Sequence, residues 1–157
     1  MPHTSTEPSI YPISLAYILA HPATKRLFDE YAAECAQPEL GDPCPQSDLY
    51  EAMEKCGTLR TFGVFSGEHL IGFASLLIYV LPHYGKKIAT TESIFVTEDS
   101  RKTGAGQKLL DFIEHYAKQN ECVAVLYTAP TGSQFSQVLE SKSRYRHSNN
   151  VFIRKLS

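Results

Sequence analysis

Residues 92–118, ESIFVTEDSRKTGAGQKLLDFIEHYAK, decide how this chain is expected to fold. The stretch begins with the apolar run 94–96, passes through a polar turn, and continues after Gly104 with the periodicity of an amphipathic helix. Glycine lets a ligand approach the backbone closely, and the first N–H groups of a helix have no partner inside it. Such a helix end binds anions, above all phosphates. The face expected to be buried carries Leu109, Ile113, Tyr116 and Ala117.

The spacing of the glycines separates the known phosphate-binding loops. A nucleoside-triphosphate loop needs G-x-x-x-x-G-K-[ST], and this string does not occur in the chain. A dinucleotide loop needs a third glycine, but Leu109 stands at that position. Arg101 and Lys102 precede the helix and add positive charge, so a phosphate or pyrophosphate ligand is expected.

Residues 96–106, VTEDSRKTGAG, fit the pattern V-x-x-x-x-R-x-x-G-x-G/A. This resembles the acyl-coenzyme A signature of the GNAT superfamily of N-acyltransferases, and the resemblance continues more weakly from residue 59 to the C-terminus. It implies that acetyl-CoA is the co-substrate, that backbone amides of 101–106 hold the pyrophosphate, and that the strand end lends backbone groups to the pantetheine arm. The cofactor-binding residues implied are Phe95, Val96, Arg101, Lys102, Thr103, Gly104, Ala105, Gly106 and Gln107, with Gln107 opening the helix.

Length and composition indicate one globular domain over residues 1–157, with residues 1–12 poorly ordered. The formal net charge of −2 argues against a nucleic-acid partner. The four cysteines include no C-x-x-C pair, so no metal site is expected. Cys35 and Cys56 fall on apolar helix faces, where buried reduced thiols are expected. No membrane span or signal peptide is indicated, and a cytoplasmic location is expected.

The order of elements predicts an α+β fold. Helices are expected at 13–20, at 25–36 with Thr24 as N-cap, and at 47–56 with Ser47 as N-cap and Gly57 as the stop. A proline-rich loop, 37–46, separates the last two. Alternation predicts strands at 59–65, 69–81 and 88–96, then 123–128 parallel to the third, a helix at 132–141 and a final strand at 150–156. The result is a GNAT-like, mostly antiparallel sheet with one parallel strand–helix–strand unit and flanking helices.

Acetyl transfer to an amine needs a base, because an alkyl ammonium has a pKa of about 10.4. Glu92 is the first candidate, since family members often place a working glutamate here and we expect it on the strand face of Ile94, where desolvation would raise its pKa. The alternative is a solvent-facing glutamate paired with Lys86 or Lys87. His83, in the turn before the same strand, is the second candidate, as base or to steer the acceptor.

The general acid is where the chain departs from the family. Many members carry a tyrosine in the last helix, and Glu140 occupies the matching position here. Tyr127 and Tyr145 are possible substitutes, and a core or surface role is the alternative for both. A thiolate of pKa about 8.5 also leaves without an acid.

These features predict an acetyl-CoA-dependent N-acetyltransferase that modifies a primary amine by direct attack. The acceptor is an amine-bearing small molecule, or a protein lysine or N-terminus. A homodimer through sheet edges or the C-terminal segment is common in similar proteins. Two alternatives stay open: a non-catalytic acyl-CoA-binding sensor or partner-binding module, and a phosphate-binding α/β module without acyl transfer.

Overall fold

A five-stranded sheet in the order β1-β2-β3-β4-β5 forms the centre of the computed structural model, which describes residues 6–156. Neighbouring strands are antiparallel from β1 to β4, and β5 is parallel to β4. The predicted α+β class and the single parallel pair are therefore confirmed. The strands are β1 Ser9–Pro12, β2 Leu59–Ser66, β3 His69–Leu81, β4 Lys86–Val96 and β5 Val125–Leu126.

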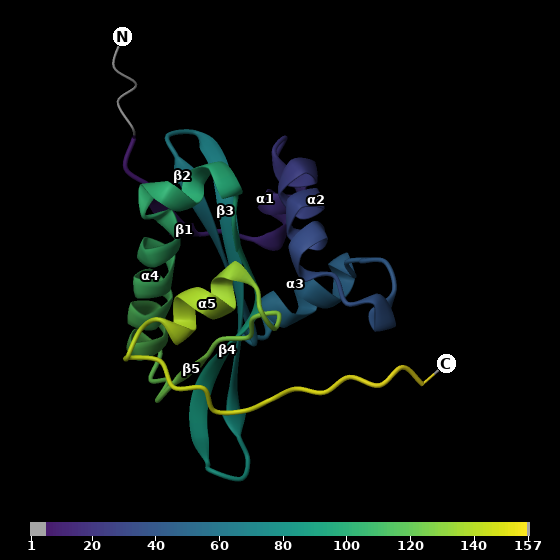
Figure 1. Ribbon diagram of the computed structural model, residues 1–157, viewed down its shortest axis with the longest axis vertical. Helices are drawn as coiled ribbons and strands as arrows, with labels where there is room; N and C mark the ends of the chain where they lie inside the picture. The colour runs from purple at the N-terminus through teal and green to yellow at the C-terminus, as the bar shows by residue number, and fades with distance from the viewer. Residues whose placement is uncertain (1–5, 157) are drawn as a thin grey trace.

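Helices lie on both sides of this sheet (Figure 1). On one side are α1 Leu15–Ala20 and α2 Thr24–Cys35, followed by the 3-10 turn η1 Pro38–Leu40 and helix α3 Ser47–Lys55. On the other side is α4 Ala105–Gln119, which follows the 3-10 turn η2 Glu98–Thr103. Helix α5, Gln134–Glu140, comes after β5. No helix in the described part of the chain is long and apolar enough to cross a membrane.

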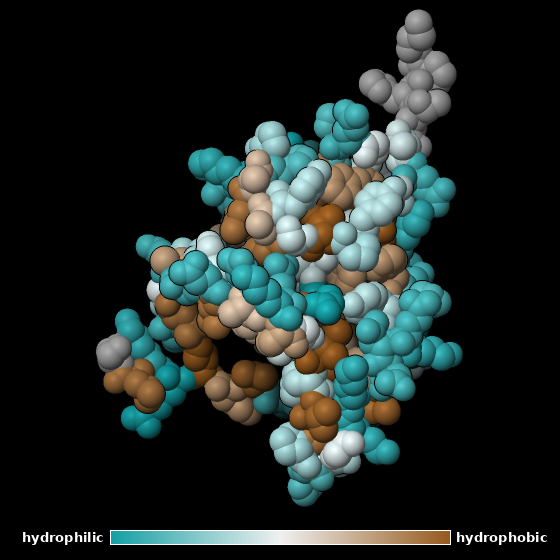
Figure 2. All heavy atoms as spheres, turned by 180° about the vertical axis from the view of Figure 1, so that it is seen from behind, coloured by the Kyte–Doolittle hydropathy of each residue, from teal (hydrophilic) through white to brown (hydrophobic). Residues whose placement is uncertain are grey.

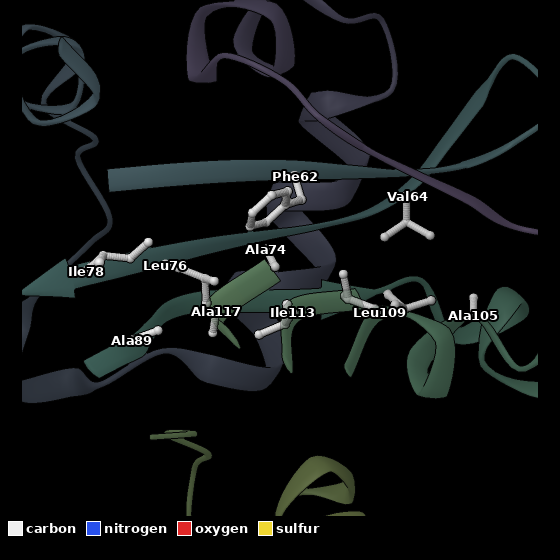
Figure 3. Close-up of a cluster of buried hydrophobic side chains, with 11 residues drawn as sticks. Phe62, Val64, Ala74, Leu76, Ile78, Ala89, Ala105, Leu109, Ile113 and Ala117 are labelled. Atoms are coloured by element: carbon white, nitrogen blue, oxygen red, sulfur yellow. The ribbon is translucent and has the colours of Figure 1, made fainter. Parts of the chain in front are cut away.

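The two sides of the sheet have separate apolar cores. Helix α4 packs Leu109, Ile113 and Ala117 against Phe62 and Leu76 of the sheet (Figure 3). The opposite cluster joins α1 and α2 to the sheet. The apolar face predicted for α4 is confirmed, and burial of these side chains accounts for the position of the helix. The opposite cluster consists of Ile18, Leu27, Phe65, Leu70, Phe73 and Phe95.

Both ends of the chain differ from the prediction. Residues 9–12 were expected to be poorly ordered, but they form β1 against Phe62–Phe65 of β2; residues 1–5 of that prediction lie outside the described residues. The strand expected at 150–156 is not formed. Val151, Phe152 and Leu156 are about nine-tenths exposed, at 89%, 90% and 92%, and the segment projects from the body (Figures 1 and 2). A strand needs a partner edge, and β5 offers only two residues.

Two predicted helix caps are wrong in detail. Thr24 and Ser47 are the first residues of α2 and α3 and not their N-caps. The Thr24 hydroxyl instead donates back to the Ile18 carbonyl, which ties α2 to α1. The stop at Gly57 is confirmed, because this residue follows the end of α3 with a φ of +81°. Cys56 lies at that helix end and is exposed, contrary to its expected burial.

Candidate active site

A β-bulge in β4 decides which way Glu92 points. Ser93 pairs with Ser75 of β3, and Thr91 pairs with Leu76, so Glu92 is an extra residue with no partner opposite. The extra residue breaks the alternation along the strand. Ile94 therefore packs with the α4 core, whereas Glu92 faces Tyr50 of α3. The expectation that Glu92 and Ile94 share a face is wrong for this reason.

Strand β4 loses its parallel neighbour next to the bulge. Strand β5 pairs only with Ala89 and Thr90, and just beyond it the Thr128 N–H donates to the Thr91 hydroxyl at 3.0 Å. From there to Val96, β4 has no further strand on this side within the described sheet. The segment expected to meet the pantetheine arm, Phe95–Val96, thus lies on an open edge with its side chains buried. The Val96 carbonyl on this edge accepts a hydrogen bond from Arg101, and the other unpaired backbone groups of the edge are available to a ligand.

The turn after β4 ends in the predicted glycine and helix. Gly104 has φ +82° and ψ 4°, a left-handed conformation that favours glycine, and α4 begins at Ala105. Gln107 therefore lies inside the first turn and does not open the helix. The first bond in the helical register runs from the Lys108 N–H to the Gly104 carbonyl at 3.0 Å. The N–H groups before Lys108 have no acceptor within the helix.

Space beside this helix end fits an anionic ligand. A Cβ added at Gly104 or Gly106 would meet no atom within 4 Å, so both glycines border an open region. Lys102 is exposed, and no ion pair in the described residues includes it. Thr103 donates its hydroxyl to the Ser100 carbonyl at 2.6 Å and closes the turn. Free amides, open space and one free lysine suit the pyrophosphate of coenzyme A.

The Arg101 side chain does not add its charge to this region as the sequence suggested. Its guanidinium donates to the Val96 carbonyl at 2.9 Å, to Glu34 of α2 at 2.7 Å and to Gln134 of α5 at 2.8 Å. It also lies over the Phe95 ring, 5.3 Å from the centroid. Arg101 therefore ties η2 to β4, α2 and α5, with its charge balanced by Glu34.

Glu92 has a partner that the sequence did not reveal. The Tyr50 hydroxyl donates to Glu92 Oε1 at 2.7 Å. Burial and this carboxylate raise the pKa of Tyr50 well above its usual range. The Glu92 side chain is exposed, so the burial expected from its apolar strand neighbours does not occur. Helical periodicity placed Tyr50 on α3, but no local signal linked residues that are 42 positions apart.

His83 lies at the other end of β4. It is exposed in the turn between β3 and β4 and packs edge-on against Tyr84, with ring centroids 5.0 Å apart. The strand between Lys86 and Glu92 spans roughly 20 Å. The structure therefore does not bring His83 together with Glu92 or with the helix end.

The residues considered as general acids have other partners. Glu140 accepts a hydrogen bond from the Ser136 hydroxyl at 2.9 Å. Tyr145 and Tyr127 donate to Glu114 Oε1 of α4 at 2.7 and 3.2 Å. Burial and Glu114 raise the pKa of Tyr145 to about 12, and burial raises that of Tyr127 further. The two phenols therefore connect the segments before and after α5 to helix α4.

No three His, Cys, Asp or Glu side chains within residues 6–156 are grouped as a metal site. All four cysteines are free.

Comparisons with known proteins agree with this geometry. A family model described as Acetyltransferase (GNAT) family matches residues 25–137. No curated protein sequence matches the chain. Two similar solved structures are a ribosomal-protein-alanine N-acetyltransferase from Brucella melitensis biovar Abortus 2308 and an aminoglycoside acetyltransferase from an uncultured soil metagenomic sample, in complex with sisomicin.

The Brucella protein is 18% identical, with a TM-score of 0.70 over 94% of this chain and 98% of its own. The soil protein is 13% identical, with a TM-score of 0.72 over 96% of this chain and 97% of its own. A GNAT family acetyltransferase of Staphylococcus aureus is 14% identical, with a TM-score of 0.67 over 96% and 99%. These structures share the fold, and the family match covers most of the elements described above. The chain belongs to the GNAT acetyltransferase family.

Proposed function

We propose that this protein transfers an acetyl group from acetyl-CoA directly to a primary amine. The single observation that carries the proposal is the turn from β4 into α4, where left-handed Gly104 and the unfilled space at Gly106 leave the helix amides open. Bound acetyl-CoA would supply an activated thioester. Backbone amides from Arg101 to Gly106, with Gln107, would hold its pyrophosphate, and the open edge at Phe95–Val96 would hold its pantetheine arm.

Glu92 is the proposed base. It lies on the same strand as the Phe95–Val96 edge and is exposed to an incoming ammonium. One carboxylate oxygen is occupied by Tyr50, and no hydrogen bond to the other occurs in the described residues. A base in this position removes the ammonium proton, directly or through a water, and leaves a neutral amine able to attack. His83 is too distant along β4 for this step, and we assign it no more than a contact with a large acceptor.

The first test is titration calorimetry of acetyl-CoA into the wild type and into a Gly106→Val variant. Valine at this position fills the open region without demanding a left-handed backbone, whereas a change at Gly104 would also strain the turn. Lys118→Val, at the far end of α4, is the matched control. Binding to wild type and control that is lost in Gly106→Val supports the site. No heat with wild type at two temperatures overturns it.

The acceptor is proposed to be a small molecule with a free amine, or a protein lysine or N-terminus. One similar structure is named for a ribosomal-protein alanine and another for aminoglycosides, so a panel should include both kinds of acceptor with a polyamine. A homodimer and a cytoplasmic location complete the proposal. The exposed apolar side chains at 151–156 support a homodimer, and light scattering would measure its mass. The four free cysteines support a cytoplasmic location, because a reducing compartment keeps thiols free.

A non-catalytic acyl-CoA-binding module is the second candidate. It is favoured by Glu140 in place of a tyrosine on α5, together with the engagement of Tyr127 and Tyr145 by Glu114. Release of thiol from acetyl-CoA with and without the amine panel separates the two functions. Tight binding without amine-dependent release would establish the second candidate.

A further inference from the structure

We propose that Tyr50 is a positioning residue, which holds the carboxylate of Glu92 in the orientation that accepts the proton of the incoming amine. The proposal rests on the proposed function, because it takes Glu92 as the base. It concerns a side chain from α3, outside both the β4 strand and the turn into α4.

The position of Tyr50 is fixed from two directions. Helix α3 buries none of its side chains fully, so apolar packing alone does not hold it. Its C-terminal half is anchored by Glu54, whose carboxylate accepts from the Leu15 N–H at 2.8 Å and whose carbonyl accepts from Arg60 at 3.1 Å. Tyr50 extends from the preceding turn of the helix to Glu92. The hydrogen bond therefore links an anchored helix to the bulge.

Glu92 needs such a partner because of where it stands. As the extra residue of a bulge it faces no residue of β3, and its side chain is exposed. A free glutamate side chain samples many rotamers, and fixing one costs conformational entropy. The phenol of Tyr50 holds Oε1 at 2.7 Å and leaves Oε2 for the ammonium. The carboxylate is thus oriented before the acceptor arrives.

The phenols around Glu92 remain donors under the conditions of the reaction. A phenol loses its proton only near pH 10, so the Tyr50 hydroxyl keeps its proton at neutral pH, and burial and then Glu92 raise its pKa further. Tyr31 of α2 packs edge-on against Phe95 with centroids 5.8 Å apart. Its pKa is raised to about 12, mainly by burial and in part by Cys35 and Glu92. Neither ring therefore becomes a competing anion beside the base.

Tyr50→Phe tests the role, because it keeps the ring and removes only the hydroxyl. We expect kcat to fall about 10- to 100-fold with little change in the acceptor KM, since a misplaced base affects the transition state more than binding. Tyr79→Phe is the matched control: its hydroxyl is 3.3 Å from that of Thr90, on the same strand as Glu92, and no hydrogen bond from it to a carboxylate occurs within residues 6–156. A Tyr50→Phe variant that behaves like Tyr79→Phe overturns the proposal.

Adding Tyr50→Phe to Glu92→Gln gives the second test. If Tyr50 acts through Glu92, the double variant is no slower than Glu92→Gln alone. A further loss of the full 10- to 100-fold in the double variant would show that Tyr50 acts independently, which contradicts the proposal.

NMR of the free protein with labelled glutamate carboxyls gives a readout that needs no acetyl-CoA. The resonance that disappears in Glu92→Gln should shift in Tyr50→Phe and stay in place in Tyr79→Phe. An unmoved resonance refutes the hydrogen bond. If the resonance shifts but Glu92→Gln keeps full activity, Glu92 is not the base, and the positioning role of Tyr50 is refuted with it. The broader proposed function still stands in that case if the wild type binds acetyl-CoA and transfers its acetyl group.

Discussion

Two glutamates in the described part of the chain, Glu92 and Glu114, accept hydrogen bonds from tyrosines, and their surroundings differ. Glu92 stands on a bulge, is exposed, and has one phenol partner at 2.7 Å. Glu114 lies on regular helix α4 and has two phenol partners, with the Arg144 guanidinium 3.5 Å away. Glu92 Oε1 thus has a single partner and its side chain is exposed, whereas two phenols and Arg144 converge on Glu114 Oε1 and the Glu114 side chain is only 33% exposed. The first arrangement suits proton transfer, and the second suits fastening of one segment to another.

The largest effect should separate the two glutamates by activity. We expect Glu92→Gln to lower kcat about 10²- to 10⁴-fold, the range found when a positioned general base is removed. The fold should survive, because the side chain is exposed and glutamine still accepts the Tyr50 hydrogen bond. Steady-state rates at saturating acetyl-CoA, with urea unfolding of the same samples, measure both quantities. An active Glu92→Gln enzyme would contradict the assignment of Glu92 as base.

The converse is expected at Glu114. Glutamine there removes the charge that two phenols and Arg144 face, and we expect the free energy of unfolding to fall by about 1–2 kcal/mol. Acetyl transfer should change little, since the residue serves to hold the segment after α5. Urea unfolding and rate assays run beside Glu92→Gln would test the contrast. A Glu114→Gln variant that is stable but slow would reverse the roles of the two carboxylates.

How much of this contrast the sequence could predict depends on how far apart along the chain the interacting residues lie. The β4 strand, the turn and α4 follow from periodicity and glycine placement within residues 92–118, so they were predicted correctly. The bulge at Glu92 has no glycine or proline to mark it. Tyr50 lies 42 positions from Glu92, and Tyr127 and Tyr145 lie 13 and 31 positions from Glu114, so only the folded chain reveals these partners.

At the C-terminal segment the sequence predicted a strand that the structure does not form. Alternation at 150–156 predicted a strand, because alternation reports which residues suit a pleated surface. It does not report whether a partner strand is present, and β5 offers only Val125–Leu126.

A smaller effect is expected from Arg144, the cation beside Glu114. Its side chain is 43% exposed, and it pairs with Asp111 at 3.0 Å. Arg144→Gln should lower the free energy of unfolding less than Glu114→Gln does, and added salt should reduce the difference, because exposed ion pairs are weak and screened. Urea unfolding at low and high salt measures this. A loss as large as that of Glu114→Gln would mean that the ion pair, and not the phenols, fastens the segment.

The smallest effect should be confined to alkaline pH. The pKa of Tyr145 is raised to about 12 by burial and by Glu114, whereas an unfolded tyrosine titrates near pH 10. Between these values the unfolded chain releases the proton and the folded chain keeps it. The contribution of Tyr145 to stability is therefore complete below pH 10 and is lost as the pH rises towards 12. The free energy of unfolding, measured from pH 9 to 12, should decline less steeply in Tyr145→Phe than in the wild type. Equal slopes would mean that Glu114 does not hold this phenol in the folded protein, and the contrast with Glu92 would then rest on Tyr127 alone.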